Sequence, residues 1–284
     1  MRRGVAILLV VLAGGVARAA PSLKRGVCAQ HLSAEDFRAL APGVSWWYNW
    51  ALTPDAEVPA GGPEFVPMLW GDSQGFWKRL DRSLAALPRL ILGLNEPNLK
   101  AQANLTPQDA ARAYARLAKA AARRGIPVVG PQLALGSAPA DTVHARDPKS
   151  GRDIAYPWMV PYLEAFSAAL PGGKPTALAV HVYGNVGELK WAVGELAKRS
   201  AGPIWVTEFN EWKAADEDAQ IAYMKEAVAF LEASPDVAGY AWFMARIKDD
   251  RTRSLLAAEP GRLTRLGETY VGLPAGKPAS PRTP

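Results

Sequence analysis

The chain has 284 residues, with 33 Lys and Arg against 27 Asp and Glu, a formal net charge of +6, and one cysteine. Because a single cysteine has no partner within its own chain, an intramolecular disulfide is excluded and the fold must be stabilised by burial. Lysines and arginines are not clustered with interleaved aromatic residues, so the sequence does not favour a nucleic-acid partner.

Residues 1–19 have the pattern of a secretory signal peptide. Arg2 and Arg3 precede an apolar run over residues 5–12, and small residues follow at Ala17 and Ala19. The run is much shorter than the roughly 20 residues of a membrane-spanning helix. Cleavage removes three arginines and no acid, which lowers the net charge from +6 to +3. We therefore expect a secreted protein, extracellular or periplasmic, that is not bound to a membrane after cleavage, although a short uncleaved anchor would have the same pattern. We also expect a monomer.

Short apolar, β-branched or aromatic runs then recur along the chain. Helical segments lie between several of them, most clearly residues 106–125, where Thr106 can cap the helix, Pro107 fits its first turn and Gly125 can end it. This alternation predicts a parallel sheet. We predict an α/β protein, a single (β/α)8 TIM barrel over residues 20–271, followed by a disordered tail over residues 272–284. The predicted strands are 26–29, 44–50, 65–70, 90–94, 127–130, 177–183, 204–209 and 237–243.

Two glutamates end predicted strands, where the active site of a (β/α)8 barrel lies. Glu96 follows the fourth run and Glu208 ends the seventh. Two carboxyl groups that rise from opposite sides of one barrel mouth suit the cleavage of a glycosidic bond. One can protonate the leaving oxygen while the other attacks the anomeric carbon. We therefore expect Glu96 and Glu208 to be the catalytic pair.

The alternation of side chains along a strand predicts which neighbours of Glu208 face inward. If Glu208 points into the barrel mouth, Ile204 and Val206 should fill the interior below it. Trp205 and Thr207 should then face the surrounding helices.

Other polar and aromatic residues at strand ends are candidates for substrate binding. His181 and Tyr183 end the sixth run with the same inward parity, and Trp242 ends the eighth. Aromatic rings are the usual platforms for the apolar faces of sugars. The full set of expected substrate-binding residues is Asn95, His181, Tyr183, Trp242, Trp47, Tyr48, Trp212 and Gln132.

Several strings of residues resemble a known family. Asn95-Glu96-Pro97 and Thr207-Glu208-Phe209 look like the acid/base and nucleophile motifs of clan A glycoside hydrolases. With the strings 46–50 (Trp-Trp-Tyr-Asn-Trp), 66–70 (Val-Pro-Met-Leu-Trp) and 181–183 (His-Val-Tyr), the chain resembles glycoside hydrolase family 128 from about residue 24 to residue 246. That family comprises β-1,3-glucanases related to the fungal alkali-sensitive-linkage proteins.

The resemblance implies a retaining endo-β-1,3-glucanase acting on a β-glucan polysaccharide. Glu96 becomes the acid/base and Glu208 the nucleophile, with carboxyl groups about 5–5.5 Å apart. Tyr183 is expected to hydrogen-bond Glu208 and keep it ionised, Asn95 to contact the 2-hydroxyl, and Trp242 to form the floor under the reacting sugar. A cis peptide bond is expected between Trp242 and Phe243.

Two alternatives to β-1,3-glucan hydrolysis remain open. The same chemistry could act on another β-glycan, such as a xylan, a galactan or a mixed-linkage glucan. The protein could instead bind cell-wall glycans with little catalysis, although both carboxylates argue against this.

Other chemistries have little support in the sequence. It contains no Gly-x-Ser-x-Gly, no His-Glu-x-x-His and no phosphate-binding loop, and three scattered histidines do not suggest a metal site. No cofactor is expected. A polar stretch over residues 137–156 carries Asp141, His144, Asp147 and Asp153, which we interpret as solvated loop charge.

Overall fold

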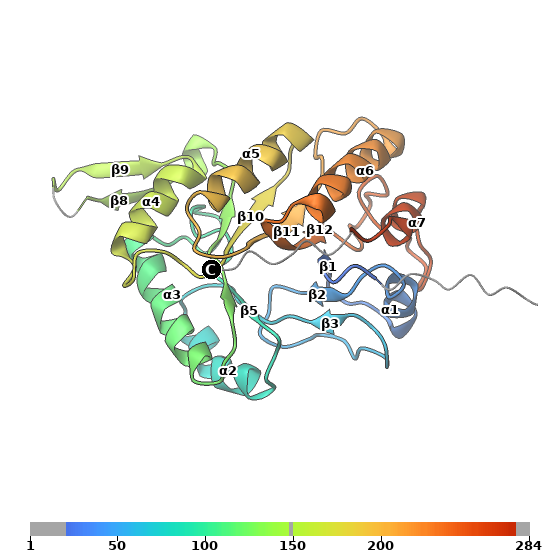
Figure 1. Ribbon diagram of the computed structural model, residues 1–284, viewed down its shortest axis with the longest axis horizontal. Helices are drawn as coiled ribbons and strands as arrows, with labels where there is room; N and C mark the ends of the chain where they lie inside the picture. The colour runs from blue at the N-terminus through green and yellow to red at the C-terminus, as the bar shows by residue number, and fades with distance from the viewer. Residues whose placement is uncertain (1–20, 148–149, 277–284) are drawn as a thin grey trace, which may run out of the picture.

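The computed structural model describes residues 21–147 and 150–276. Within this part of the chain, no helix combines the length and the apolar character needed to cross a membrane. Helices lie around the outside of the molecule, and most of the strands lie inside them (Figure 1). The helices are α1 (Ala34–Leu40), α2 (Gln74–Ala85), α3 (Pro107–Ala122), α4 (Met159–Ala169), α5 (Val186–Ala197), α6 (Glu217–Ala233) and α7 (Arg265–Gly272), with a 3₁₀ turn at Pro139–Asp141.

The predicted parallel α/β architecture is confirmed. Seven strands form one mainly parallel sheet in the order β3-β2-β1-β12-β11-β10-β7, and three more form a parallel sheet in the order β4-β5-β6. The strands are β1 (Arg25–Cys28), β2 (Trp46–Tyr48), β3 (Glu64–Phe65), β4 (Met68–Leu69), β5 (Ile91–Gly93), β6 (Val128–Val129), β7 (Gln132–Ala134), β10 (Leu178–Val182), β11 (Ile204–Phe209) and β12 (Val237–Trp242).

Two segments are interrupted near a proline, which has no N–H to donate to a neighbouring strand. The first is the predicted strand 65–70, and the second begins in the predicted strand 127–130 and continues beyond its end to β7. On one side of Pro67, β3 pairs with β2. On the other side, β4 pairs with β5. Pro131 lies in the same way between β6, which pairs with β5, and β7, which pairs with β10. Each interrupted segment therefore takes part in both sheets.

Buried side chains form two clusters. The larger one packs the strands against the helices and includes Phe37, Leu117 and Phe166 from helices. The smaller one, here called the inner cluster, contains buried residues contributed by or adjoining strands of both sheets and none from a helix. Strands of the two sheets therefore face one another across the inner cluster. Its buried members are Cys28, Trp46, Tyr48, Val66, Met68, Leu90, Leu92, Val129, Ala177, Ala179, Trp205 and Ala241.

Helix α3 begins as the sequence predicts. The Thr106 side chain accepts a hydrogen bond from the backbone N–H of Asp109, and Pro107 occupies the first turn. Gly125, three residues after the helix, has φ of +68°, a conformation that glycine adopts without the steric cost of a Cβ atom. This local agreement fixes where α3 begins and ends.

Two predictions about irregular segments need correction. Part of the polar stretch over residues 137–156 is an antiparallel hairpin, β8 (Val143–Arg146) with β9 (Asp153–Tyr156), which projects from the body in Figure 1. His144 contacts Asp153 across this hairpin at 2.8 Å.

The predicted disordered tail begins too early. Gly272 ends α7, and the carbonyl groups of Leu273 and Pro274 accept hydrogen bonds from the buried Arg25 guanidinium. The N–H of Gly276 donates to Glu232. The rest of the tail and the predicted signal peptide lie outside the described residues.

Candidate active site

A cleft of about 710 Å³ opens where the predicted site residues end their strands. Glu96, His181 and Tyr183 line it from the segments that follow β5 and end β10. Gly136 and Glu211 lie on its walls. The cleft therefore contains one catalytic carboxylate of the predicted pair and two of the predicted binding residues.

The backbone holds Glu96 in a conformation that is rare for a residue with a side chain. Its φ is +42°, and its N–H donates to the carbonyl of Gln132 at 2.8 Å. Asn98 fixes the same turn, because its side chain donates to the Ala134 carbonyl and accepts from the Ala134 N–H. Such strain persists only where surrounding contacts enforce it, and here they aim Glu96 at the cleft.

Glu208 points toward the same site because β11 contains a bulge. The strand pairs Val180 with Val206 and then His181 with Glu208, so β11 has one more residue than β10 at this point. The predicted alternation is therefore wrong. Trp205 belongs to the inner cluster, whereas Ile204 and Val206 pack toward the helices.

Three side chains donate hydrogen bonds to the Glu208 carboxylate. Trp50 Nε1 lies 2.7 Å and the Tyr48 hydroxyl 3.0 Å from Oε1, while the Tyr183 hydroxyl bonds Oε2. The tyrosine contact expected from the family resemblance is thus present. Each donor is neutral and favours the ionised form of the carboxylate it contacts.

The single cysteine lies beneath this carboxylate. Cys28 is fully buried, and its Sγ is 3.5 Å from the Tyr48 hydroxyl and 3.3 Å from the carbonyl oxygen of Thr207. Burial raises the pKa of the Cys28 thiol well above its usual value. The thiol therefore acts as a neutral packing group under the bulge of β11.

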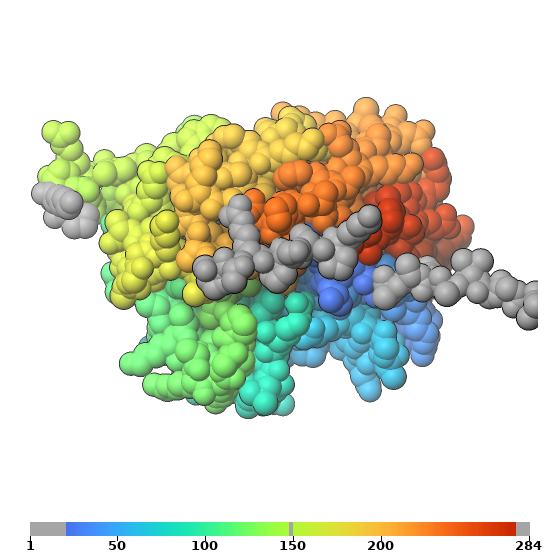
Figure 2. All heavy atoms as spheres, in the orientation of Figure 1, coloured from blue at the N-terminus to red at the C-terminus, as the bar shows by residue number. Residues whose placement is uncertain are grey.

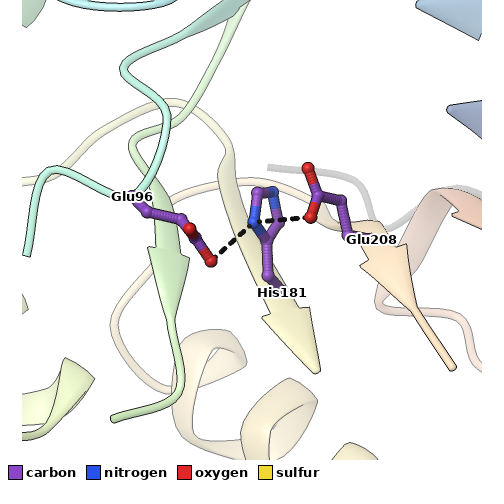
Figure 3. A group of neighbouring side chains, drawn as sticks. All are labelled: Glu96, His181 and Glu208. Atoms are coloured by element: carbon purple, nitrogen blue, oxygen red, sulfur yellow. Dashed lines mark hydrogen bonds and ion pairs between the residues drawn. The ribbon is translucent and has the colours of Figure 1, made fainter. Parts of the chain in front are cut away.

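His181 stands between the two carboxylates, as Figure 3 shows. Its Nδ1 is 3.0 Å from Glu96 Oε1 and 3.3 Å from Glu208 Oε2. One oxygen of each carboxylate and a ring nitrogen of His181 lie within 4.8 Å of one another. Such a set could also ligate a metal ion, but its hydrogen bonds already explain the arrangement.

Burial and mutual charge set the protonation of this group. Burial, together with the charge of Glu96, raises the pKa of Glu208, and the charge of His181 and the donors Tyr183 and Trp50 only partly oppose that rise. The sequence predicts that Tyr183 and other donors keep Glu208 ionised. The donors Tyr183 and Trp50 do lower its pKa, but burial and the charge of Glu96 outweigh them.

The pKa of His181 is also raised. Burial on its own would lower it, but the charge of Glu208, together with the hydrogen bond and the charge of Glu96, outweighs burial. The charge of Glu96 thus influences the pKa values of His181 and Glu208, and these two groups influence each other's pKa values.

Three predicted substrate-binding aromatics do not face the cleft. Trp47 is fully buried against Phe37 and Phe65, on the helix side of its sheet. Tyr48 is fully buried and holds Glu208 instead of a sugar. Trp242 is also fully buried.

The structure corrects the two predictions made for Trp242. Its ring packs against Phe209, and its Nε1 donates to the Arg253 carbonyl at 2.8 Å, so it cannot form a sugar-binding floor. The next residue, Phe243, is partly exposed and meets both Trp50 and Tyr183 edge-on. The non-proline cis peptide also lies one residue later than expected, between Phe243 and Met244.

Of the remaining candidates, Asn95 and Gln132 support the Glu96 segment, and Trp212 is exposed to solvent. Asn95 donates from Nδ2 to Gln102, and Gln132 donates from Nε2 to the carbonyl of Gly93, so both brace the Glu96 segment. Trp212 is 49% exposed and lies edge-on to Tyr183, with the Arg253 guanidinium 4.8 Å from its ring centroid. Trp212 is the most exposed of the predicted aromatic residues.

Two residues at the site were not identified from the sequence. Trp50 shares the parity of Trp46 and Tyr48, so the string 46–50 contained a signal that it lies on the inner side. Asn98 follows Asn95-Glu96-Pro97 directly, but nothing in the string reveals its reciprocal bonds to Ala134.

The chain matches the family described as glycosyl hydrolase catalytic core over residues 26–270. No curated protein matches it. Three similar solved structures all come from glycoside hydrolase family 128. A subgroup II endo-β-1,3-glucanase from Sorangium cellulosum shares 30% identity, covers 89% of this chain and 99% of its own, and has a TM-score of 0.73. One from Pseudomonas viridiflava shares 34% identity, covers 90% and 100%, and has a TM-score of 0.72.

The third similar structure is a curdlan-specific exo-β-1,3-glucanase of subgroup III from Blastomyces gilchristii, solved with glucose. It shares 28% identity, covers 90% of this chain and 100% of its own, and has a TM-score of 0.69. Because the family match covers most of the described residues and two of these structures reach 30% identity over nearly their whole length, this chain is a glycoside hydrolase that belongs to family 128.

Proposed function

We propose that this protein is a secreted, retaining endo-β-1,3-glucanase on a closed (β/α)8 barrel, with Glu96 as acid/base and Glu208 as nucleophile. The observation that carries the proposal is the placement of His181 between a carboxylate that lines the open cleft and one that accepts three hydrogen bonds. Because the chain belongs to a glycoside hydrolase family, we interpret this pair of carboxylates as the groups that cleave a glycosidic bond.

Three features support closure of the strands into a barrel. The segments around Pro67 and Pro131 each pair with both sheets. The inner cluster draws its buried side chains from strands of both sheets or residues beside them, and from no helix. A short backbone bridge between Asn95 and Gln132 adds a further link near the catalytic residues.

The environments of the two glutamates support their different roles. Glu208 is nearly enclosed and receives hydrogen bonds from Tyr48, Trp50 and Tyr183, which stabilise the carboxylate when it loses its proton. Glu96 lines the cleft, so its carboxyl group can reach a leaving oxygen. In the first step Glu96 gives its proton to that oxygen while a Glu208 oxygen bonds the anomeric carbon.

Water completes the proposed cycle. Formation of the covalent bond removes the negative charge of Glu208, so Glu96 can then accept a proton from an attacking water. His181, hydrogen-bonded to Glu96 and 3.3 Å from Glu208, couples these changes of charge. The water's oxygen takes the place of Glu208 on the sugar, which restores both carboxyl groups.

The spacing of the carboxylates supports retention of configuration. Oxygens of Glu96 and Glu208 lie within 4.8 Å of each other. Retaining glycosidases have carboxyl groups about 5–5.5 Å apart, whereas inverting enzymes need about 6.5–9.5 Å to admit a water molecule. The observed spacing leaves little room for such a water.

The similar proteins support β-1,3-glucan as the substrate and endo action as the mode. The two structures that share 30% and 34% identity with this chain are endo-β-1,3-glucanases. Beside the cleft, we assign sugar contacts to Trp212 and Phe243, which both pack edge-on against the cleft residue Tyr183. Asn95 remains the proposed contact to the 2-hydroxyl.

We extend the proposal to the parts of the chain that the structure does not describe. Residues 1–19 are the proposed signal peptide, which would direct the protein to the extracellular space or the periplasm. The catalytic domain would begin at residue 20 and act as a monomer.

A polysaccharide panel tests the substrate. Wild-type protein and the Glu208→Gln and Glu211→Gln variants are assayed for new reducing ends on β-1,3-glucan, xylan, galactan and mixed-linkage glucan. Glu211 is the matched control because it also lines the cleft but makes no contact with His181. We expect cleavage of β-1,3-glucan that Glu208→Gln abolishes and Glu211→Gln retains. Cleavage of only another glycan, or binding without cleavage, would sink the proposal.

The stereochemistry has its own test. Azide should rescue Glu208→Ala and give the α-glycosyl azide, whereas rescue of Glu96→Ala should give the β-azide, because each variant lacks one carboxylate of the two-step reaction. NMR of freshly released wild-type product should show retained configuration. A product of inverted configuration refutes the retaining assignment.

A further inference from the structure

The positive charge of this chain is concentrated in one segment. Residues 74–127 contain ten Lys and Arg and three Asp and Glu, a net charge of +7, which leaves −1 for the rest of a chain whose total is +6. The ten cations are Lys78, Arg79, Arg82, Arg89, Lys100, Arg112, Arg116, Lys119, Arg123 and Arg124. Nearly all of them belong to α2, to α3 or to the residues that follow these helices.

Folding brings these cations onto one exposed surface. Helices α2 and α3 lie side by side in Figures 1 and 2, and two contacts join them. The guanidinium of Arg116 lies 3.9 Å from the Trp77 ring centroid, and Arg124 is 3.7 Å from Asp81. We call the exposed side chains of Lys78, Arg82, Arg112, Arg116, Lys119 and Arg123 the basic face.

Helical spacing aligns the α3 members of the basic face. Arg112, Arg116, Lys119 and Arg123 follow one another at intervals of four, three and four residues, so they form one stripe along the helix. Like charges at these intervals destabilise a helix. The helix dipole favours Lys119 and Arg123 near the C-terminal end of α3, but it does not favour Arg112 and Arg116 in the earlier turns.

Few acids neutralise the basic face. Arg112 pairs with Asp109, which lies three residues earlier in the same helix. Among residues 21–147 and 150–276, Arg82, Lys119 and Arg123 form no ion pair. Much of the charge is thus available to an external anion.

We propose that the basic face binds a linear acidic polysaccharide, a chain that carries carboxylates along its length. Arginine guanidinium groups match carboxylates in bidentate geometry. Helix α3 has 16 residues, about 24 Å at 1.5 Å per residue, so its stripe offers cations over several sugar units. Cations in a row along a convex helix suit an extended chain better than a compact ligand.

The same surface fits two other polyanions less well. Membrane binding uses an apolar face beside the cations, but Leu87 is the one exposed large apolar side chain described within residues 74–127. Single-stranded nucleic acids stack their bases on aromatic faces. Here Arg116 covers Trp77, and Arg79 lies over Phe76.

The basic face and the cleft are separate surfaces. None of its six residues lines the cleft. A bound acidic chain would therefore leave the cleft open to a second, neutral glycan. This binding is distinct from the proposed glucanase activity. It would retain the hydrolase within a matrix of mixed polysaccharides.

The test compares two triple variants of the full chain. Arg82→Gln/Lys119→Gln/Arg123→Gln removes three cations of the basic face, and Lys225→Gln/Lys248→Gln/Arg251→Gln removes three exposed cations elsewhere. Affinity electrophoresis in gels that contain polygalacturonate measures binding at low and high salt. We expect the first variant to bind at least about tenfold more weakly than wild type and the second to bind as wild type does. Wild-type binding should fall steeply with salt.

Parallel measurements separate this inference from others. Circular dichroism should show both variants folded, and hydrolysis of a short neutral β-1,3-glucan should be equal in all three proteins. Equal binding by the two variants overturns the inference, as does tighter wild-type binding to duplex DNA or to phosphatidylglycerol vesicles than to polygalacturonate. Loss of hydrolysis in wild type would instead count against the proposed glucanase function alone.

Discussion

Trp50→Phe removes one hydrogen bond from Glu208 while an aromatic ring remains beside Tyr48 and Phe243. The bond that is lost runs from Trp50 Nε1 to Glu208 Oε1 over 2.7 Å. A hydrogen bond to a charged group contributes about 1.5–3 kcal/mol, which is roughly 10- to 150-fold in rate wherever ionisation of Glu208 limits the reaction. The pKa of Glu208, already raised by burial, should rise further without this donor.

The assay is kcat/KM for a soluble β-1,3-glucan oligosaccharide, measured from acidic to mildly alkaline pH. We expect the acid limb of the Trp50→Phe profile to move to higher pH, so the loss is large in acid and shrinks as Glu208 ionises. Trp242→Phe is the matched control, because it loses an indole hydrogen bond to the Arg253 carbonyl within the core. It should lower stability and leave the acid limb in place. An unshifted limb in Trp50→Phe, or an equal shift in both variants, refutes the role given to Trp50.

Three further predictions concern sugar binding, pH and the fold. Trp212→Ala should raise KM for long β-1,3-glucan oligosaccharides by roughly 2- to 10-fold at unchanged kcat, since an aromatic contact contributes about 0.5–1.5 kcal/mol; a fall in kcat alone would contradict a stacking role. Because the pKa of His181 is raised in the folded protein, its contribution to stability is complete below about pH 6.5 and is lost as pH rises through the raised value. Thermal melts of wild type and His181→Gln should therefore differ most in acid and converge with rising pH, and a constant difference would disprove the linkage. Arg25→Met should cost about 3–5 kcal/mol in urea denaturation, because it leaves the buried Glu232 carboxylate without its partner at 3.2 Å. The exposed pair of Arg124 provides the control, since Arg124→Met should stay within about 0.5 kcal/mol, and equal losses in the two variants would argue against a buried-charge effect.

The meeting of Glu96 and Glu208 at one site could be predicted because its signals are local. A glutamate that directly follows an apolar run must lie near the end of a strand, and parallel strands end on one side. The positions of Glu96 and Glu208 in the chain were therefore sufficient to bring them to one site. His181 contacts both carboxylates from the end of β10, which is adjacent to β11 and is separated from β5 by β6 and β7.

Side-chain direction could not be predicted, because it depends on irregularities that the sequence does not mark. One extra residue in β11 reverses the alternation, so Trp205 enters the inner cluster and Glu208 still reaches the site. At the end of β12 the prediction was also wrong by one residue, because Phe243 and not Trp242 packs against Tyr183 at the site. Simple period-two alternation fails at such positions, since bulges and strained turns commonly re-aim the side chains of active sites.

The basic face could not be predicted from the sequence for a different reason. In the linear sequence its cations are three or four residues apart, between alanines, and do not form a recognisable run. Only when α3 forms do Arg112, Arg116 and Lys119 line up, and only when α2 packs beside it does Arg82 join them. The net charge of the whole chain does not reveal this uneven distribution of cations.

Buried Cys28 gives the molecule an intrinsic reporter. It is the one thiol of the chain, and it contacts Tyr48 and Thr207 directly beneath Glu208, the proposed nucleophile. Because Cys28 is fully buried, a thiol reagent can reach it only when the surrounding structure opens, so the rate of alkylation in native buffer measures how often this region opens. The catalytic floor can thus be followed chemically, without introducing a label or a new cysteine.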